Sequence, residues 1–464
     1  MTLYKFEYGC RVRVGFRAQV ARSASRPSAR RKALGCKAST TSAGSMPSVE
    51  VQELETEYLL GTYAGARPAG VSFVRGDGCR LFDAEGREYL DFTSGIAVNC
   101  LGHSDKELTD VLSDQLRTLV HVSNLYSTEP AALLARELCK ASSPWAQKAF
   151  FVNSGTEANE AAIKFARKYQ KLNGKGSPSL LGRKQQPTEF VAFSAGFHGR
   201  TMGALALTSK AKYRTPFEPV MPGVKFAEYN NLKSAAKVIR RGRTCAVFVE
   251  PFQGEGGCNP STRDFLVGLR KLCDDAGALL VYDEVQCGLG RTGKMFAHQW
   301  YGEGACPDIM TLAKPLAAGL PIGAVLMTNE IAEAISLGDH GSTFAGGPFV
   351  CTSGLHVMSR LQEGGFLQEV SDKGDYLVGK LSEAVGGKSF VREVRGKGLI
   401  VGIEIDRSAG PIVAKARDRG LLVITAGEGN VVRLVPPLVV ERGDIDRCVE
   451  VLKECFEEVG AAEA

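Results

Sequence analysis

Short apolar runs alternate with helical patterns through the middle of the chain. Runs with the length of buried strands occupy residues 149–154, 189–194, 245–251, 278–285 and 323–328. Residues 156–170 instead carry an apolar stripe at helical spacing, made of Ala158, Ala161, Ala162, Phe165, Ala166 and Tyr169. Strands that alternate with helices predict an α/β fold in which helices cover both faces of a mostly parallel sheet.

The N-terminal part of the chain has a different pattern. Residues 49–64 indicate a short polar helix. Residues 72–95 indicate short strands, with turns at Gly76–Gly78 and at Glu85–Gly86. These strands precede the alternating pattern, so we expect them to join a smaller domain rather than the main sheet.

The C-terminal part again mixes short strands with helices and closes on a helical pattern at residues 443–460. We therefore expect two domains. The large one covers residues 104–346, and a smaller α+β domain combines residues 47–103 with residues 347–464.

Residues 1–46 differ from the rest of the chain in charge. They hold ten basic residues and one acid, a net charge of +9, whereas the whole chain carries +6 and the remainder therefore −3. The segment is rich in Ser, Thr and Ala and lacks the continuous apolar core of a secretory signal. This composition is typical of an organellar transit peptide and slightly favours the chloroplast over the mitochondrion. A basic disordered tail that stays attached is the alternative.

The remaining composition argues against several other classes of protein. The mature part is mildly acidic, so it lacks the basic footprint expected of a nucleic-acid-binding protein. The thirteen cysteines include no C-x-x-C pair and no Cys/His cluster, so we expect reduced thiols and no metal site. No apolar run reaches the roughly 18 residues of a membrane span.

Candidate chemistry lies at the carboxyl ends of the predicted strands, where ligands of an open α/β sheet bind. After the first strand, Ser154 and Glu157 have the spacing of a helix capping box, and Gly155 allows close backbone approach. Such a helix N-terminus can hold a phosphate, although an ordinary helix cap has the same pattern. Asp283 ends another buried strand, where a carboxylate needs a cation, a strong donor or an ion pair.

Two glycine-rich loops follow other strands. In the first, SAGFHGRT, Phe197 can stack on a planar ligand and Arg200 can hold a carboxylate in a bidentate fork. A turn with a solvated arginine is the simpler interpretation. In the second, VEPFQGEGGC, Glu250 and Glu255 flank a glycine-rich turn.

Lys314 lies in the apolar, glycine-rich run TLAKPLAAGLPIG. A lysine kept out of water loses its proton more readily and becomes a nucleophile, although solvated loop lysines are far commoner. A phosphorylated pyridine aldehyde fits this set of features: a phosphate cradle, a buried acid, an aromatic ring, an arginine that can hold a carboxylate, and an activated lysine. The sequence therefore predicts pyridoxal 5′-phosphate as the cofactor.

Six motifs, in order and spacing, resemble those of the class III aminotransferases that use pyridoxal phosphate. They are FVNSGTEANEAAIKFARK, FHGRT, VEPFQGEGG, DEVQCGLGRTGKMFA, PDIMTLAKPLAAGLPIGAVL and GDHGSTFAGGP. Within that family the chain is most similar to the plant-type acetylornithine branch, from about Tyr58 to near the C-terminus. The resemblance implies a fold-type I pyridoxal-phosphate transferase.

The resemblance also implies roles for residues around the cofactor. Lys314 would form the Schiff base and shuttle the proton, and Asp283 would pair with the pyridinium nitrogen. The other residues expected to contact the cofactor are Ser154, Gly155, Thr156, Phe197 and Gln286. Thr343 resembles the residue that reaches the phosphate of the neighbouring subunit, which implies a homodimer with shared sites.

Substrate contacts follow from the same resemblance. Arg200 would hold the α-carboxylate of the ω-amino substrate, and Arg433 that of 2-oxoglutarate or glutamate. Glu255 resembles an acidic gate that pairs with Arg433 while the diamine substrate is bound. Asn124 lies in a segment that lines the substrate tunnel in the family.

The implied reaction moves the δ-amino group of N2-acetylornithine to 2-oxoglutarate, giving N-acetylglutamate 5-semialdehyde and glutamate, a step of arginine biosynthesis. The alternatives are another activity of the class, such as ornithine or 4-aminobutyrate aminotransferase or an aminomutase, and a non-catalytic binding protein on the same fold. No obvious tyrosine gate accompanies TSGIAVNCLGH, which favours the acetylated substrate. The chain departs from the plant-type pattern at Ala318, where glycine is usual, and at Cys100, where alanine is usual.

Overall fold

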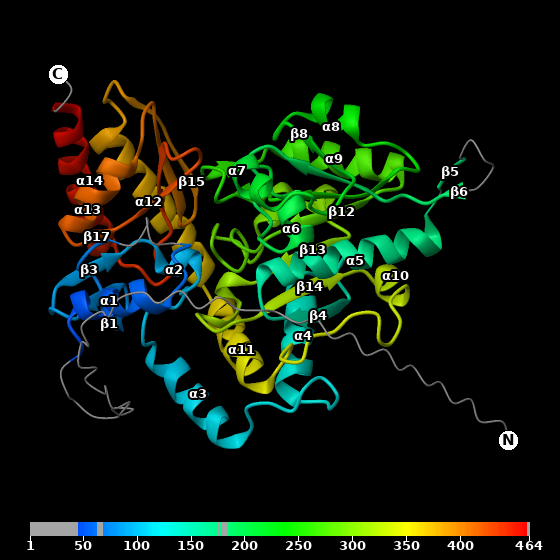
Figure 1. Ribbon diagram of the computed structural model, residues 1–464, viewed down its shortest axis with the longest axis horizontal. Helices are drawn as coiled ribbons and strands as arrows, with labels where there is room; N and C mark the ends of the chain where they lie inside the picture. Colours follow the sequence, from blue (N-terminus) through cyan, green and yellow to red (C-terminus); the bar gives the residue numbers. More distant parts are fainter. Residues whose placement is uncertain (1–44, 63–67, 175, 179–183, 462–464) are drawn as a thin grey trace, which may run out of the picture. The chain divides into compact units, whose positions relative to one another are not determined.

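A seven-stranded sheet is the largest element of the fold (Figure 1). The computed structural model describes residues 45–62, 68–174, 176–178 and 184–461. The strands lie in the order β4 (Lys148–Val152), β14 (Gly323–Met327), β13 (Ile309–Leu312), β12 (Leu279–Asp283), β9 (Thr244–Val249), β7 (Glu189–Phe193) and β8 (Val224–Ala227). Only β14 runs antiparallel to its neighbours. The prediction of a mostly parallel sheet is thus confirmed. Two of its strands, β8 at one edge and β13 between β14 and β12, are not among the predicted strands.

Alternate residues of the sheet strands pack into two different cores. In β9, Ala246 and Phe248 face one core, whereas Val247 and Val249 face the other. The first core is completed by α5 (Gly155–Asn173), and the second by α9 (Arg263–Ala276) among other helices. Because both faces are covered, every residue of β9 and β12 is buried, which explains their unbroken apolar runs.

The helix α5 lies along β13 and β14 (Figure 1). Its predicted stripe is buried at Ala158, Ala161, Ala162, Phe165 and Ala166, and partly buried at Tyr169. Small side chains in this stripe let the helix approach the sheet closely, so the first turn of α5 is fixed at the carboxyl end of β4. The other helices near the sheet are α4 (Glu129–Ala141), α6 (Met202–Leu207), α7 (Ala211–Arg214), α8 (Leu232–Val238), α10 (Asn329–Glu333) and α11 (Pro348–Gln362).

Segments from both ends of the chain share one small sheet. The strands β1 (Phe73–Asp77), β2 (Arg80–Asp83) and β3 (Glu88–Asp91) form an antiparallel meander, and β17 (Leu421–Leu422) joins β3 in parallel. Figure 1 shows β1 and β3 in blue beside β17 and α13 in orange. The first turn lies later than predicted, because Gly76 and Asp77 belong to β1 and, of the predicted turn, only Gly78 lies between β1 and β2. The predicted turn at Glu85–Gly86 lies between β2 and β3.

A second small sheet carries the C-terminal half of the site. Its antiparallel order is β15 (Val391–Lys397), β16 (Ile400–Ile405), β19 (Val431–Leu434) and β18 (Ile424–Ala426). It packs with α12 (Phe366–Val385), α13 (Gly410–Asp418) and α14 (Arg442–Ala461), the last matching the predicted closing helix. Residues 46–464 form one compact unit, so the division near residue 346 stays a prediction.

The remaining elements are short. The predicted N-terminal helix is α1 (Ser48–Tyr58). The strands β5 (Ser177–Pro178) and β6 (Lys184–Gln185) form a two-stranded sheet. The others are α2 (Ser94–Ala97), α3 (Lys106–Thr118), β10 (Phe252–Gln253), β11 (Asn259–Pro260), η2 (Thr215–Phe217), η3 (Ala297–Tyr301), η4 (Glu303–Ala305) and η5 (Lys314–Ala317). The predicted transit peptide, residues 1–46, lies outside the described residues except for Ser45 and Met46. No helix within the described ranges is both long and apolar enough to cross a membrane.

Candidate active site

A cavity of about 380 Å³ opens at the carboxyl ends of the central strands. It is lined by residues that follow β4, β7, β9, β12 and β13, including Ser154, Gly155, Thr156, Phe197, Arg200, Asp283, Gln286 and Lys314. The structure therefore brings together eight of the residues that the sequence predicts for one site, although they come from four different strand ends.

Lys314 is the first residue of η5, directly after β13. The side chain reaches the cavity, while Pro315, Leu316 and Ala317 behind it are buried. Burial lowers the pKa of Lys314 below its ordinary value, and the positive charge of Arg433 lowers it further. The carboxylates of Asp283, Glu255 and Glu250 oppose this shift without cancelling it. A lysine in this setting loses its proton more readily than an exposed one.

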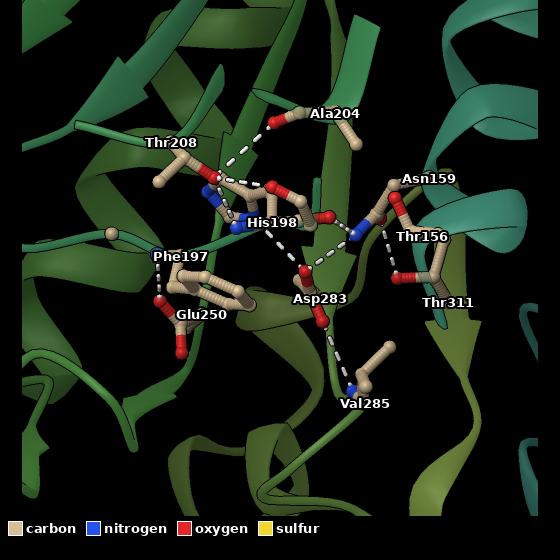
Figure 2. A network of polar contacts seen from close by, with 12 residues as sticks. Thr156, Asn159, Phe197, His198, Ala204, Thr208, Glu250, Asp283, Val285 and Thr311 are labelled. Atoms are coloured by element: carbon tan, nitrogen blue, oxygen red, sulfur yellow. Dashed lines mark hydrogen bonds and ion pairs between the residues drawn. The ribbon is translucent and has the colours of Figure 1, made fainter. Parts of the chain in front are cut away.

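Asp283 is 3% exposed and is held in place by three donors (Figure 2). Its Oδ2 accepts hydrogen bonds from Asn159 Nδ2 and His198 Nδ1, both at 2.8 Å, and its Oδ1 accepts one from Val285 N–H at 3.0 Å. Asn159 is fixed in turn, because its Oδ1 accepts from Thr311 Oγ1 at 2.9 Å. The carboxylate therefore has a defined direction and lines the cavity.

Two more titratable groups surround Asp283 in Figure 2. Burial alone would lower the pKa of His198, but the hydrogen bond and the charge of Asp283 outweigh it and raise that pKa. Burial raises the pKa of Glu250 to about 7, with a further contribution from the negative charge of Asp283 and an opposing one from His198. Glu250 also accepts from Phe197 N–H at 3.0 Å. Negative charge is thus concentrated under one side of the cavity.

The N-terminus of α5 forms the opposite wall of the cavity. Ser154 is its N-cap, and Ser154 Oγ accepts from Glu157 N–H at 3.3 Å. The predicted capping box is present only in part, because Glu157 Oε2 accepts from Asn153 N–H at 2.7 Å rather than from the N-cap residue. A Cβ on Gly155 would lie 2.7 Å from Val285 Cγ1, so only glycine fits there. Main-chain N–H groups and an enclosed helix end make an anion-binding cradle.

Phe197 and Arg200 come from the loop after β7. The Arg200 guanidinium stacks 3.5 Å over the Tyr213 ring and 5.6 Å from the Phe197 ring, and its side chain is exposed. Arg200 N–H and Thr201 N–H donate to Thr156 Oγ1, both at 3.2 Å. The loop is therefore fixed to the first turn of α5, and its cationic head stays available to a ligand at the mouth of the cavity.

Arg433 and Glu255 form a partly buried ion pair beside Gln286. Arg433 on β19 is 2% exposed, and its Nη2 lies 2.9 Å from Glu255 Oε2. Its Nη1 donates to Gln286 Oε1 at 3.0 Å. Since Gln286 lines the cavity, it connects this pair to the rest of the site.

Asn124 and Thr343 do not line the Lys314 cavity of this chain. Asn124 Nδ2 donates to the Ser342 carbonyl oxygen at 3.0 Å, and both Asn124 and Thr343 are exposed. Asn124 belongs to a separate hollow with Tyr126, Ala345 and other neighbours. These two predicted site residues therefore lie close to each other, on a surface away from the Lys314 cavity.

The two departures from the plant-type pattern both touch the Lys314 segment. Cys100 is fully buried, and its Sγ donates to the Pro315 carbonyl oxygen at 3.3 Å. Ala318 has φ of 45°, in the left-handed region where a Cβ is strained.

We expect Ala318→Gly to raise the free energy of unfolding by up to about 1 kcal/mol, because glycine adopts this φ without strain. Denaturant unfolding of both proteins would measure the change. Ala317→Gly, in the same buried turn but not at positive φ, is the matched control and should lower stability. An equal loss in both variants would contradict the strain at residue 318.

Several residues of the site have no assigned role from the sequence, namely Asn159, His198, Thr208, Glu250 and Thr311. The available signal was Asn159, which with Gln170 is one of two amides on the mainly apolar buried face of α5. Among the described residues, no group of three or more His, Cys, Asp or Glu side chains could hold a metal ion.

Comparisons of the whole chain with known proteins identify its family. A model of the family "Aminotransferase class-III" matches residues 63–456. The chain is 56% identical over 409 residues to the mitochondrial acetylornithine aminotransferase of Alnus glutinosa, with 88% of each chain covered. It is 33% identical to the solved N-acetylornithine aminotransferase of Stenotrophomonas maltophilia, with a TM-score of 0.73 over 87% of this chain and 100% of that one. The ornithine aminotransferase of Toxoplasma gondii aligns with a TM-score of 0.81 at 26% identity, over 89% and 96%.

Proposed function

Because the chain belongs to the class III aminotransferases, we propose that it transfers the δ-amino group of N2-acetylornithine to 2-oxoglutarate in arginine biosynthesis. The reaction is reversible and gives N-acetylglutamate 5-semialdehyde and glutamate. The observation that carries the reaction type is the joint presence of Lys314, Asp283 and the N-terminus of α5 in one cavity. The substrate choice rests on the 56% identity to an acetylornithine aminotransferase.

The cofactor is pyridoxal 5′-phosphate, as in the class III aminotransferases. When bound, it supplies an aldehyde for the amino group and a protonated ring that withdraws electrons from the adjacent carbon. The donor set fits this molecule. The α5 N-terminus with Ser154, Gly155 and Thr156 would hold the phosphate, and the buried Asp283 carboxylate would hold a cationic ring nitrogen.

The other residues of the cavity orient the ring and move the proton. Phe197, whose main chain is fixed by Glu250, would cover one face of the ring. Gln286, which accepts from Arg433, would contact the ring hydroxyl. Lys314 would supply the amine that holds the cofactor, and the same Nζ, once free, would carry the proton from and to the reacting carbon. Its lowered pKa suits both tasks.

Two arginines give the site two carboxylate grips, one for each amino donor. Arg200 at the mouth binds the α-carboxylate of N2-acetylornithine, whose reacting amine lies at the far end of the molecule. Arg433 deeper in the site binds the α-carboxylate of 2-oxoglutarate or glutamate, whose reacting carbon is adjacent. Glu255 neutralises Arg433 while the first substrate is bound and must release it for the second.

We expect Arg200→Ala to raise the Michaelis constant for N2-acetylornithine about 10- to 100-fold, because a bidentate charged contact is lost. The constant for 2-oxoglutarate should change much less. Steady-state kinetics with each substrate varied in turn would measure both. Arg214→Ala, a nearby arginine that stacks on Phe226 instead, is the control. Equal effects on both substrates would reject this role for Arg200.

The protein is further proposed to act as a homodimer with shared sites. Asn124 and Thr343 lie together outside this chain's own cavity, beside exposed apolar side chains such as Leu125, Tyr126 and Phe344. Such a surface suits a second copy. In the dimer, Thr343 reaches the phosphate and Asn124 the substrate path of the neighbouring site.

The basic segment of residues 1–46 is proposed to direct the protein to an organelle. The relative from Alnus is named as a mitochondrial protein, which supports the mitochondrion. The slight compositional preference for the chloroplast stays a prediction. Microscopy of a fusion that carries residues 1–46 ahead of a fluorescent protein would separate the two compartments.

The visible absorbance of cofactor-loaded protein tests the function directly. Addition of N2-acetylornithine without any 2-oxo acid should convert the absorbance band at a much lower concentration than ornithine or 4-aminobutyrate. Conversion by ornithine first would favour the activity of the Toxoplasma protein, to which the fold is also similar. No conversion by any amine would leave only a binding protein on this fold.

A further inference from the structure

The turn that carries Glu255 is held from several sides. Gly427 N–H donates to the Glu255 carbonyl oxygen at 3.0 Å. Arg395 donates to the Gly257 carbonyl oxygen through Nε at 3.1 Å and Nη2 at 2.7 Å. Gly256 packs so closely that a Cβ there would lie 2.4 Å from the Ala195 carbonyl oxygen. The main chain is therefore fixed, and the Glu255 carboxylate can leave Arg433 only by rotation of its own side chain.

A carboxylate released from Arg433 in this place needs a new partner. The Glu255 side chain is 25% exposed and its arginine partner 2%, so separation leaves charge in a poorly hydrated environment. Leaving an ion without a partner there is strongly unfavourable. An acceptor for the rotated carboxylate would remove most of that cost.

Three neighbouring cations of the site have roles or firm partners of their own. Lys314 is committed to the cofactor in the proposed function. Arg395 is bonded to Glu393, to Glu404 and to the Gly257 carbonyl oxygen. Arg200, stacked on Tyr213 at the exposed mouth, is proposed to hold the other substrate. A fourth cation, Lys210 in the segment after α6, is bound less completely: it donates to one carbonyl oxygen and forms a long ion pair with the exposed Glu428.

Lys210 has an enclosed ammonium with donor capacity to spare. Its side chain is 9% exposed, and Nζ donates to the Gly427 carbonyl oxygen. Glu428 Oε1 lies 3.8 Å away, too far for a hydrogen bond. An ammonium has three N–H donors, and in the described part of the chain one acceptor is recorded for it.

One residue, Gly427, contacts both Lys210 and Glu255. Its carbonyl oxygen accepts from Lys210 Nζ, while its N–H donates to the Glu255 carbonyl oxygen. The ammonium and the gate residue thus flank the same glycine. Burial lowers the pKa of Lys210, and the negative charges of Glu428 and, next, of Glu255 oppose this shift.

We propose that Lys210 is the second partner of the Glu255 carboxylate and receives it when the carboxylate of a 2-oxo acid occupies Arg433. Lys210 is a positioning residue in this scheme: it acts through Glu255 and touches neither substrate. The proposal rests on the proposed function, because it assumes two substrates that use Arg433 differently. The proposal adds Lys210 as a residue that sets the relative affinity of the site for the two substrates.

Single-turnover kinetics of the complete protein would test the role of Lys210. With Lys210→Met, the apparent dissociation constant for 2-oxoglutarate, measured on protein loaded with pyridoxamine phosphate, should rise about tenfold, because Glu255 then competes for Arg433. The constant for N2-acetylornithine, measured on pyridoxal phosphate protein, should stay within about twofold. Lys210→Arg keeps the cation and should restore much of the loss. Lys212→Met, at an exposed lysine two positions along, should change neither constant.

A double-mutant cycle separates this role from a structural one. In a Glu255→Gln background no charge needs a second partner, so Lys210→Met should then change 2-oxoglutarate binding by less than about twofold. Additive effects, or an equal rise for both substrates, would overturn the proposal. If wild-type protein reacts with neither substrate, the proposed function itself fails, which these kinetics show separately.

A crystal structure of the wild-type protein with pyridoxamine phosphate and 2-oxoglutarate needs no variant. It should place a Glu255 oxygen within about 3.2 Å of Lys210 Nζ. A carboxylate turned to solvent, or still on Arg433, would overturn the proposal.

Discussion

Replacing Lys314 by alanine is expected to lower kcat/KM by at least about 10³-fold in both half-reactions, since one residue serves as nucleophile and as proton carrier. The chain offers no substitute at that position. Lys314 is the first residue of η5, and Arg433, whose charge lowers the pKa of Lys314, is itself paired with Glu255. The phosphate cradle does not involve Lys314, so the cofactor should still bind, without its covalent link.

The visible spectrum and the two half-reactions measure this result. Lys314→Ala should show the spectrum of non-covalently held aldehyde, and a small primary amine added in solution should restore part of the rate by supplying the missing base. Lys294→Ala, at an exposed lysine outside the cavity, is the control. Transamination at the wild-type rate would remove Lys314 from the mechanism and favour a different nucleophile.

Three predicted site residues that line the cavity share one property: each ends a strand or follows it within two positions. Ser154, Asp283 and Lys314 stand at the ends of β4, β12 and β13, which lie within one stretch of the sheet order. A parallel sheet brings the carboxyl ends of its strands to one edge. Finding the strand ends in the sequence was therefore sufficient to predict that these residues meet, without knowledge of any loop conformation.

The residues that the sequence does not reveal reach the site across long separations. His198 meets Asp283 from another strand end, 85 positions away, and Asn159 meets it from α5, 124 positions away. No local spacing encodes such a meeting, because it depends on strand order and on the depth at which α5 packs. Asn124 and Thr343 show the opposite case, since their motifs are recognisable although one chain does not bring them into its own cavity.

Asp283→Asn is expected to slow the first half-reaction about 10²- to 10³-fold, because an adjacent opposite charge is worth roughly one to three pKa units to the ring nitrogen. The substitution also disturbs the network in Figure 2. Asn159 Nδ2 and His198 Nδ1 both point at one oxygen of Asp283, and Val285 N–H points at the other. Whichever way the new amide turns, its NH₂ group faces a donor. The pKa of His198 should fall as well, since the carboxylate that raises it is gone and burial alone lowers it.

Two effects are therefore mixed in this variant, and a cofactor analogue separates them. An analogue whose ring nitrogen is permanently cationic does not need Asp283 to keep a proton, so it should restore most of the rate if the loss is electrostatic. If the loss comes from a displaced network, the analogue should restore little, and the unfolding free energy should drop by the roughly 1–3 kcal/mol of an unsatisfied buried group. Stopped-flow absorbance with each cofactor measures the rate. Unchanged kinetics with the natural cofactor would reject Asp283 as the partner of the ring nitrogen, leaving Glu250 as the other buried carboxylate that lines the cavity.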